Sequence, residues 1–178
     1  MKKLLMLTVA VATLSTMAIA GGLEVGEGVG AFYVKDVTGP AAGTKLCYRC
    51  RYGQKPVVSI FARNMDDNVA SLVKSVDGVV AKNQSKDMAA FVVLLSDSPE
   101  STEADLKKVA QSKGITSTPL TTFDGVTGPS SYKISKDAEV TVMMWVGGKL
   151  KVNEELKASD LSAEKINSIV GKTGTILN

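Results

Sequence analysis

The 178-residue sequence has no histidine, only two cysteines and few aromatic residues, which make up 5% of the chain. The absence of histidine excludes Ser-His and Cys-His catalytic arrangements and removes the commonest side-chain ligand of protein-bound metals. Apolar residues make up 44% of the chain and charged residues 22%, which is a globular composition and excludes disorder, collagen and coiled coil. Thiol chemistry is the one reactive chemistry that the composition indicates.

Net charge is also small. The formal charge is +3 for the whole sequence and falls to +1 when Lys2 and Lys3 are removed. The remaining charges are scattered, so the sequence lacks the basic patch that nucleic-acid binding requires, and no nucleic-acid partner is expected. One local group of four cations surrounds the two cysteines: Lys45, Arg49, Arg51 and Lys55.

Residues 1–20 have the layout of a secretory signal peptide. Lys2 and Lys3 form a basic start, residues 4–12 form an apolar run, and the stretch ends in Ala18-Ile19-Ala20. This layout predicts cleavage after Ala20 and export, either to a periplasm or out of the cell. The alternative is an uncleaved membrane anchor, which four polar residues between positions 8 and 16 make a poor span. We therefore expect no stable membrane anchor after cleavage.

The remaining sequence has the pattern of an α/β domain. Two apolar runs at 57–62 and 89–95 predict strands that are buried on both faces, and each is followed by apolar residues at helical spacing. Further strands are predicted at 31–34, 120–123, 140–146 and 149–152, and a last helix after Ser162. No linker divides the chain, so we predict a single domain over residues 25–178.

Two stretches of sequence carry a recognisable pattern: VGEGVGAFYVKDVTGP at 25–40 and GQKPVVSIFARN at 53–64. They contain a phenylalanine strand, an aspartate turn, a Gly-x-x-Pro-Val-Val motif and a central strand. This pattern resembles the opening of peroxiredoxin-like members of the thioredoxin superfamily. The resemblance covers about residues 25–172 by the order of elements. It implies a thioredoxin-like mixed sheet, with central parallel strands, a C-terminal antiparallel hairpin and helices on both faces.

The active-site positions that the resemblance implies are vacant. The family carries its redox cysteines directly after the central strand, where the N-terminus of the next helix stabilises a thiolate. That place reads Arg63-Asn64-Met65-Asp66-Asp67 here. The proline that the family carries before the long strand is also missing, since residues 138–140 read Ala-Glu-Val. The usual peroxidase or thioredoxin site is therefore absent, and no catalytic residue is carried over.

The two cysteines form the motif Cys47-Tyr48-Arg49-Cys50, which precedes the central strand. Because six residues of strand span roughly 20 Å, we expect the pair at the opposite end of the sheet from the family's site. The sequence after Cys50 does not favour a long helix, so thiolate stabilisation is assigned to the neighbouring cations Arg49, Arg51 and Lys45. We predict Cys47 to be the exposed, attacking thiol and Cys50 the shielded, resolving one.

Three interpretations of the motif stay open: a structural disulfide that shapes a turn, a redox-active pair, and half of a metal site completed by carboxylates or a second molecule. They support two functions. The first is an exported thiol–disulfide oxidoreductase or thiol sensor that uses Cys47 and Cys50 on a protein thiol or disulfide partner. The second is a non-catalytic binding module with a structural disulfide. No cofactor and no metal are predicted for either function, and the oligomeric state is left open.

Overall fold

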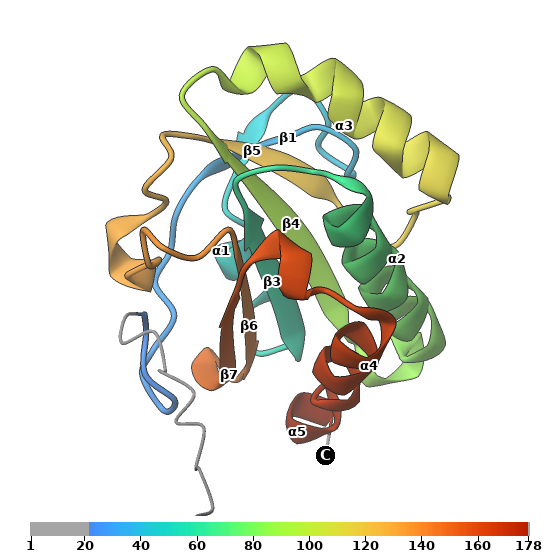
Figure 1. Cartoon of the computed structure of the whole chain (residues 1–178). Helices are drawn as coiled ribbons and strands as arrows, with labels where there is room; N and C mark the ends of the chain where they lie inside the picture. Colours follow the sequence, from blue (N-terminus) through green and yellow to red (C-terminus); the bar gives the residue numbers. More distant parts are fainter. Residues whose placement is uncertain (1–21, 178) are drawn as a thin grey trace, which may run out of the picture.

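The computed structural model describes residues 22–177, in which seven strands form one mixed sheet with the order β2-β1-β5-β4-β3-β6-β7 (Figure 1). The strands are β1 (Val34–Asp36), β2 (Lys45–Leu46), β3 (Val57–Ala62), β4 (Ala89–Ser96), β5 (Leu120–Asp124), β6 (Val140–Val146) and β7 (Lys149–Leu156). The α-helices are α1 (Tyr48–Tyr52), α2 (Asp67–Lys82), α3 (Pro99–Lys113), α4 (Ala163–Gly171) and α5 (Gly174–Leu177). The predicted signal peptide lies outside the described residues.

The centre of the sheet is arranged as the sequence predicts. Strand β3 pairs in parallel with β4, and β4 pairs in parallel with β5. Strand β6 is antiparallel to both β3 and β7, so a C-terminal hairpin extends the sheet. The predicted thioredoxin-like α/β class is therefore confirmed. None of the helices between residues 22 and 177 is long and apolar enough to cross a membrane.

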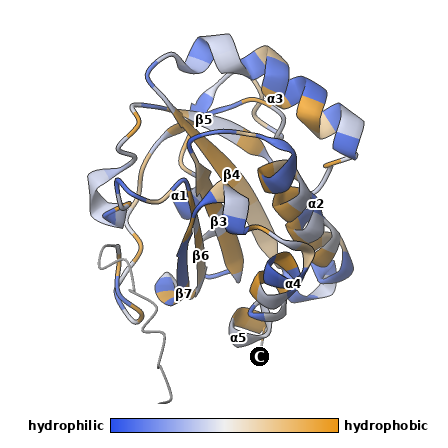
Figure 2. Ribbon diagram, in the orientation of Figure 1, coloured by the Kyte–Doolittle hydropathy of each residue, from blue (hydrophilic) through white to orange (hydrophobic). Residues whose placement is uncertain are grey.

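One face of the sheet is covered by the long helices. Every residue of β3 is buried, and its alternate residues Val58, Ile60 and Ala62 pack with the apolar sides of α2, α3 and α4. The helices show their apolar residues toward the sheet and their polar residues outward (Figure 2). This amphipathic pattern explains why the spacing of apolar residues located α2 and α3 in the sequence.

The other face is covered by an aromatic layer and short segments. Its members come from the N-terminal segment, α1, the sheet and the 3₁₀ turn η2 (Ser130–Tyr132): Phe32, Tyr48, Phe61, Phe91, Tyr132 and Trp145. Their rings contact one another, with centroids 4.8–6.2 Å apart, and the pair Tyr48–Phe91 is stacked. Helical structure thus lies on both faces, but only the first face carries long helices.

Two local expectations are corrected. The first strand begins at Val34, later than the predicted 31–34, because Phe32 leaves the sheet to pack in the aromatic layer. The segment around the cysteines forms the short strand β2 and the single-turn helix α1, neither of which the sequence pattern indicated. Helix α1 ends at Gly53, whose φ of 56° is a left-handed conformation that glycine adopts without strain.

A buried hydrogen bond fastens α1 to the sheet. The hydroxyl of Tyr48 donates to Oδ2 of Asp36 at 2.9 Å, and both side chains are almost fully buried. The same carboxylate accepts the backbone N–H groups of Gly39 and Ala41, at 2.7 and 2.8 Å. Since each Asp36 oxygen has a donor, the cost of burying this carboxylate is offset by hydrogen bonds. The aspartate turn of the sequence is therefore the anchor of α1.

We predict that Tyr48→Phe destabilises the protein by about 1–3 kcal/mol, because it leaves a buried carboxylate oxygen with one donor fewer. Urea unfolding followed by circular dichroism measures the change. The matched control is Tyr33→Phe, since Tyr33 is 68% exposed and should tolerate loss of its hydroxyl within about 0.5 kcal/mol. Equal losses in the two variants would contradict the anchoring role of Tyr48.

Candidate functional site

Cys47 and Cys50 are joined by a disulfide bond, with their Cα atoms 5.2 Å apart. The pair lies beside the start of β3 and the β6–β7 turn: the N–H of Gly147, in that turn, donates to the carbonyl of Gln54 at 3.1 Å. The family's redox position lies at the other end of β3, after Ala62. The disulfide is thus at the end of the sheet where its sequence position places it.

Helix α1 is built around the sulfur of Cys47. Cys47 is the N-cap of the helix, and its Sγ accepts the backbone N–H of Cys50 at 3.0 Å. The helix has only five residues, so its backbone dipole contributes little beyond this one N–H group. A thiolate at Cys47 would keep the same donor, because the hydrogen bond comes from the backbone.

The exposure of the two sulfur-bearing residues is the reverse of the sequence prediction. Cys47 is only 7% exposed, whereas Cys50 is exposed to solvent. Tyr48 and Tyr52 occupy positions i and i+4 of α1, so both rings lie on its inner side and contact Phe91. Cys50 lies midway between them in sequence and therefore on the outer side of the helix. The expectation that Cys47 is the outward residue is wrong for this reason.

The two tyrosines of α1 act as packing groups. Burial raises the pKa of Tyr48 far above its usual value, and the hydrogen bond to Asp36 raises it further. Burial likewise raises the pKa of Tyr52, whose hydroxyl donates to the carbonyl of Ala90 at 3.3 Å. Both phenols stay neutral at physiological pH, so neither supplies a base to the cysteines.

Of the predicted cations, Arg49 forms hydrogen bonds that hold the structure together. Its Nε donates to the carbonyl of Val29 and its Nη1 to the carbonyl of Gly53, both at 3.1 Å. A side chain at Gly148 would overlap its guanidinium, so this glycine, with a φ of 70°, makes room for Arg49. Arg49 therefore ties together the N-terminal segment, α1 and the β6–β7 turn.

Arg51 is a free cation beside the disulfide. It is exposed, follows Cys50 directly, and its guanidinium forms no hydrogen bond or ion pair within residues 22–177. Lys45 is also exposed, on β2, whereas Lys55 pairs with Asp87 at 2.9 Å. No cluster of three or more histidine, cysteine or acidic side chains occurs in the described part of the chain, so the cysteines gain no acidic metal ligands there.

The family's active-site position is filled by a structural arginine. Arg63 follows β3, and its guanidinium donates to the carbonyls of Ala138 at 2.8 Å and Ser135 at 3.0 Å, and also to that of Val126. Asp66 caps α2 by accepting the N–H of Val69 at 2.9 Å. The helix N-terminus that the family uses for a thiolate is therefore occupied by a carboxylate.

Two small cavities flank Arg63, of about 210 and 340 Å³. Asn64 also lines both of them. The larger one is bordered by Glu139, which precedes β6 and stands in the place of the family's proline. The described chain has no cis peptide bond, at this position or elsewhere. The side chains at this end of β3 thus make structural contacts, with Arg63 bound to loop carbonyls and Asp66 to the start of α2.

Comparison with known proteins finds structures of similar fold but no relative by sequence. No protein-family model and no curated protein matches the sequence. Among solved structures, a proposed protein disulfide isomerase from Bacteroides thetaiotaomicron is similar with a TM-score of 0.66 and 17% identity, over 88% of this chain and 92% of that one.

Two further structures show the same arrangement. Plasmodium vivax 2-Cys peroxiredoxin, in reduced form, has a TM-score of 0.62 and 15% identity, over 85% of this chain and 96% of the peroxiredoxin. A proposed thiol:disulfide interchange protein DsbE from Chlorobium tepidum has a TM-score of 0.60 and 14% identity, over 83% and 98%. The chain therefore has a thioredoxin-like fold, with a disulfide at the end of the sheet opposite the position where the resemblance places redox cysteines.

Proposed function

We propose that the protein is an exported thiol–disulfide oxidoreductase or thiol sensor that works through the Cys47–Cys50 disulfide. The observation that carries the proposal is the asymmetry of the pair: Cys50 is exposed, whereas Cys47 is buried and accepts a backbone hydrogen bond. An exchange reaction needs one sulfur that a partner can reach and one that can leave as a stabilised thiolate. The pair in α1 provides both.

The exchange proceeds in two steps. A partner thiolate attacks Sγ of Cys50, the Cys47–Cys50 bond breaks, and Cys47 leaves as a thiolate while a mixed disulfide forms through Cys50. A second thiolate of the partner then attacks the partner's sulfur in that mixed disulfide and releases Cys50. The partner dithiol is oxidised and the protein's disulfide is reduced by two electrons; the reverse sequence reduces a partner disulfide.

The surroundings favour Cys47 as the leaving thiolate. The N–H of Cys50 already points at Sγ of Cys47, at 3.0 Å, and a hydrogen bond to a thiolate lowers the pKa of the thiol. A leaving thiol of lower pKa departs faster. The free guanidinium of Arg51 adds positive charge next to Cys50, which favours the approach of an anionic thiolate.

The partner is proposed to be a protein thiol or disulfide, since Cys50 is exposed on the outer side of α1, where a bulky substrate can approach. Two of the structurally similar proteins are proposed to be a disulfide isomerase and a thiol:disulfide interchange protein. Export, which the first twenty residues suggest, supports the same chemistry because disulfides persist in oxidising compartments.

We expect Cys47→Ser to retain an attacking thiol and Cys50→Ser to lose it, the opposite of the assignment from sequence. The reduced Cys47→Ser protein should form a mixed disulfide with oxidised glutathione about tenfold faster than Cys50→Ser, because its remaining thiol is accessible. Mass spectrometry of the quenched reactions follows the adduct. Urea unfolding of both variants controls for loss of structure.

The alternative function, a binding module with a structural disulfide, makes a different prediction for the same pair. A reduction potential below about −300 mV would mark the bond as structural and contradict the proposed exchange. Equal reactivity of the two serine variants would contradict the assigned roles of the cysteines without deciding between the two functions.

Arg51 should lower the pKa of the Cys50 thiol. In the reduced Cys47→Ser background, Arg51→Gln removes a neighbouring cation, so the pKa of Cys50 should rise by a few tenths of a unit and the thiolate fraction at pH 7 should fall. The pH dependence of alkylation by iodoacetamide measures this pKa. The matched control is Lys55→Gln, which removes an exposed cation that already pairs with Asp87 and should leave the pKa of Cys50 unchanged.

The proposed export predicts a specific N-terminal residue for the mature protein. Mass spectrometry of the protein purified from its native cell should find Gly21 as the N-terminal residue, because the pattern of residues 1–20 directs cleavage after Ala20. Recovery of chains that begin at Met1 in a soluble cytoplasmic fraction would contradict both cleavage and export. That outcome would leave the thiol chemistry itself to be judged by the cysteine variants.

A further inference from the structure

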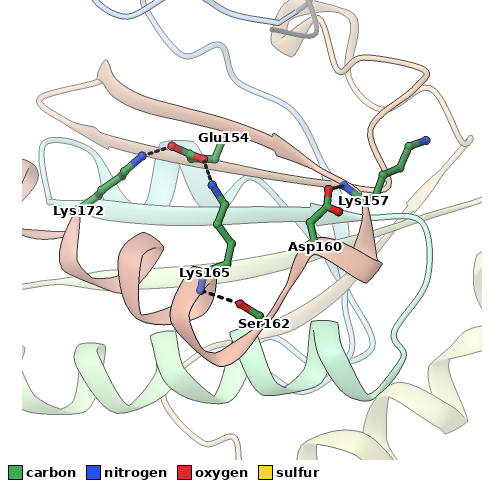
Figure 3. Close-up of polar contacts among 6 residues, drawn as sticks. All are labelled: Glu154, Lys157, Asp160, Ser162, Lys165 and Lys172. Atoms are coloured by element: carbon green, nitrogen blue, oxygen red, sulfur yellow. Dashed lines mark hydrogen bonds and ion pairs between the residues drawn. The ribbon is translucent and has the colours of Figure 1, made fainter. Parts of the chain in front are cut away.

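The two edges of the sheet differ in what covers them. Strand β7, at one edge, is paired with the N-terminal segment, where the N–H of Gly26 donates to the carbonyl of Leu150 at 2.8 Å. Farther along β7, the carboxylate of Glu154 pairs with Lys165 at 2.9 Å and with Lys172, so α4 is held beside this strand (Figure 3). The chain itself therefore occupies the β7 edge.

Strand β2 forms the other edge, and within residues 22–177 it pairs with β1 alone. The N–H of Asp36, on β1, donates to the carbonyl of Thr44 at 2.9 Å, so that carbonyl points toward β1. The N–H of Lys45 belongs to the same peptide group and points the opposite way, as does the carbonyl of Lys45 in this antiparallel register. Neither group has a hydrogen-bond partner in the described chain. Such a pair of backbone groups is a template for another strand.

The disulfide directly continues this open edge. Cys47 follows Lys45 by two residues, and its backbone is still extended, with φ −106° and ψ 101°. Because main-chain groups alternate along an extended chain, the N–H of Cys47 points outward like that of Lys45, and it too has no partner within residues 22–177. Any segment that pairs with β2 would therefore pass beside the bond between Cys47 and the exposed Cys50.

Two exposed cations and one exposed ring lie near the disulfide at this edge. Lys45 and Arg51 are exposed, and neither forms an ion pair within the described residues. The register of β1 and β2 places Tyr33, which is 68% exposed, opposite Cys47. Unpaired cations favour a partner that carries negative charge, and exposed tyrosine is enriched where proteins bind one another.

We infer that the open edge of β2 binds the partner of the proposed exchange as an extended, acidic segment that runs antiparallel to β2. The inference rests on the proposed function, which brings a protein thiol to Cys50. In an antiparallel pair, one residue of the partner exchanges both main-chain hydrogen bonds with Lys45. The residue two positions before it then lies opposite Cys47. The partner's cysteine belongs at that position, followed after one residue by an acidic residue opposite Lys45.

The strand pairing positions the reaction and adds no chemical step to it. The partner's thiolate attacks Sγ of Cys50, the disulfide bond breaks, and Cys47 leaves as a thiolate, as in the proposed exchange. Holding the thiol beside the disulfide raises its effective concentration and so its rate of attack. Main-chain bonds supply affinity for an extended segment, whereas the side chains beside them supply preference for its sequence.

The probe for the experiment is a short peptide of threonine and valine with one cysteine and, two positions after it, one glutamate. Mass spectrometry of quenched samples follows the rate at which the peptide thiol opens the disulfide of the oxidised protein. N-methylation of the glutamate removes the donor to the carbonyl of Lys45 and should slow opening about fivefold, as expected for loss of one hydrogen bond. The matched control is N-methylation of the residue before the glutamate, whose N–H points away from β2. It should slow opening less than about twofold.

Two variants test the protein side of the pairing. Lys45→Gln removes the charge and keeps the outward N–H, so it should slow opening by the unmethylated peptide about twofold. Lys45→Pro removes the N–H as well and should slow opening about tenfold. An edge strand tolerates proline where the N–H faces solvent, and urea unfolding of both variants checks that the fold is kept.

Reduced glutathione, which is too short to pair as a strand, separates this inference from the proposed function. If glutathione opens the disulfide but the two methylated peptides react at equal rates, the inference is overturned and the proposed exchange stands. If Lys45→Pro slows glutathione as much as it slows the peptide, the inference is also overturned. A disulfide that neither glutathione nor any peptide opens would contradict the proposed exchange and the inference with it.

Discussion

The burial of β3 on both faces is the constraint on which the rest of the structure depends. All six of its residues are buried, so each face of the sheet needs its own cover. Long amphipathic helices cover one face, and aromatic side chains from short segments cover the other. The second cover is assembled from distant parts of the sequence, and its members are held by specific polar contacts such as Tyr48 to Asp36. Helix α1, beside the disulfide, packs the rings of Tyr48 and Tyr52 against Phe91 on this face.

This packing of α1 explains how the cysteines are presented. Tyr48 and Tyr52 must face the sheet, and in a single helical turn this requirement leaves Cys50 on the outside and Cys47 at the buried cap. The accessibility of each sulfur follows from the packing of its neighbours and owes nothing to a general rule for CxxC turns. Arg49 strengthens the same geometry, because its three-way contact holds α1 against the β6–β7 turn and the N-terminal segment.

The core of the fold could be predicted from the sequence, whereas the details of the site could not. Buried strands such as β3 and β4 show continuous apolar runs, and α2 and α3 show helical spacing, so their patterns are local. Helix α1 has no such pattern, since five residues cannot show periodicity and its inward face is set by Phe91, a residue of β4. The role of Arg49 was equally hidden, because its carbonyl partner on Val29 lies twenty residues away in sequence.

The two ends of β3 carry different groups: the structural residues Arg63 and Asp66 follow one end, and the disulfide lies near the other. At the end after Ala62, Arg63 donates to carbonyls of the 126–138 loop and Asp66 caps the N-terminus of α2. These contacts stabilise the structure there. At the near end, the disulfide has one backbone donor and the exposed cations Lys45 and Arg51 nearby, a weaker stabilisation of a thiolate than the N-terminus of a sixteen-residue helix provides. The proposed exchange does not require a strongly stabilised thiolate, because an attacking thiol works best with a pKa near the ambient pH. In the proposed exchange, the displaced pair differs from the usual site in the groups that would stabilise its thiolate as well as in its position.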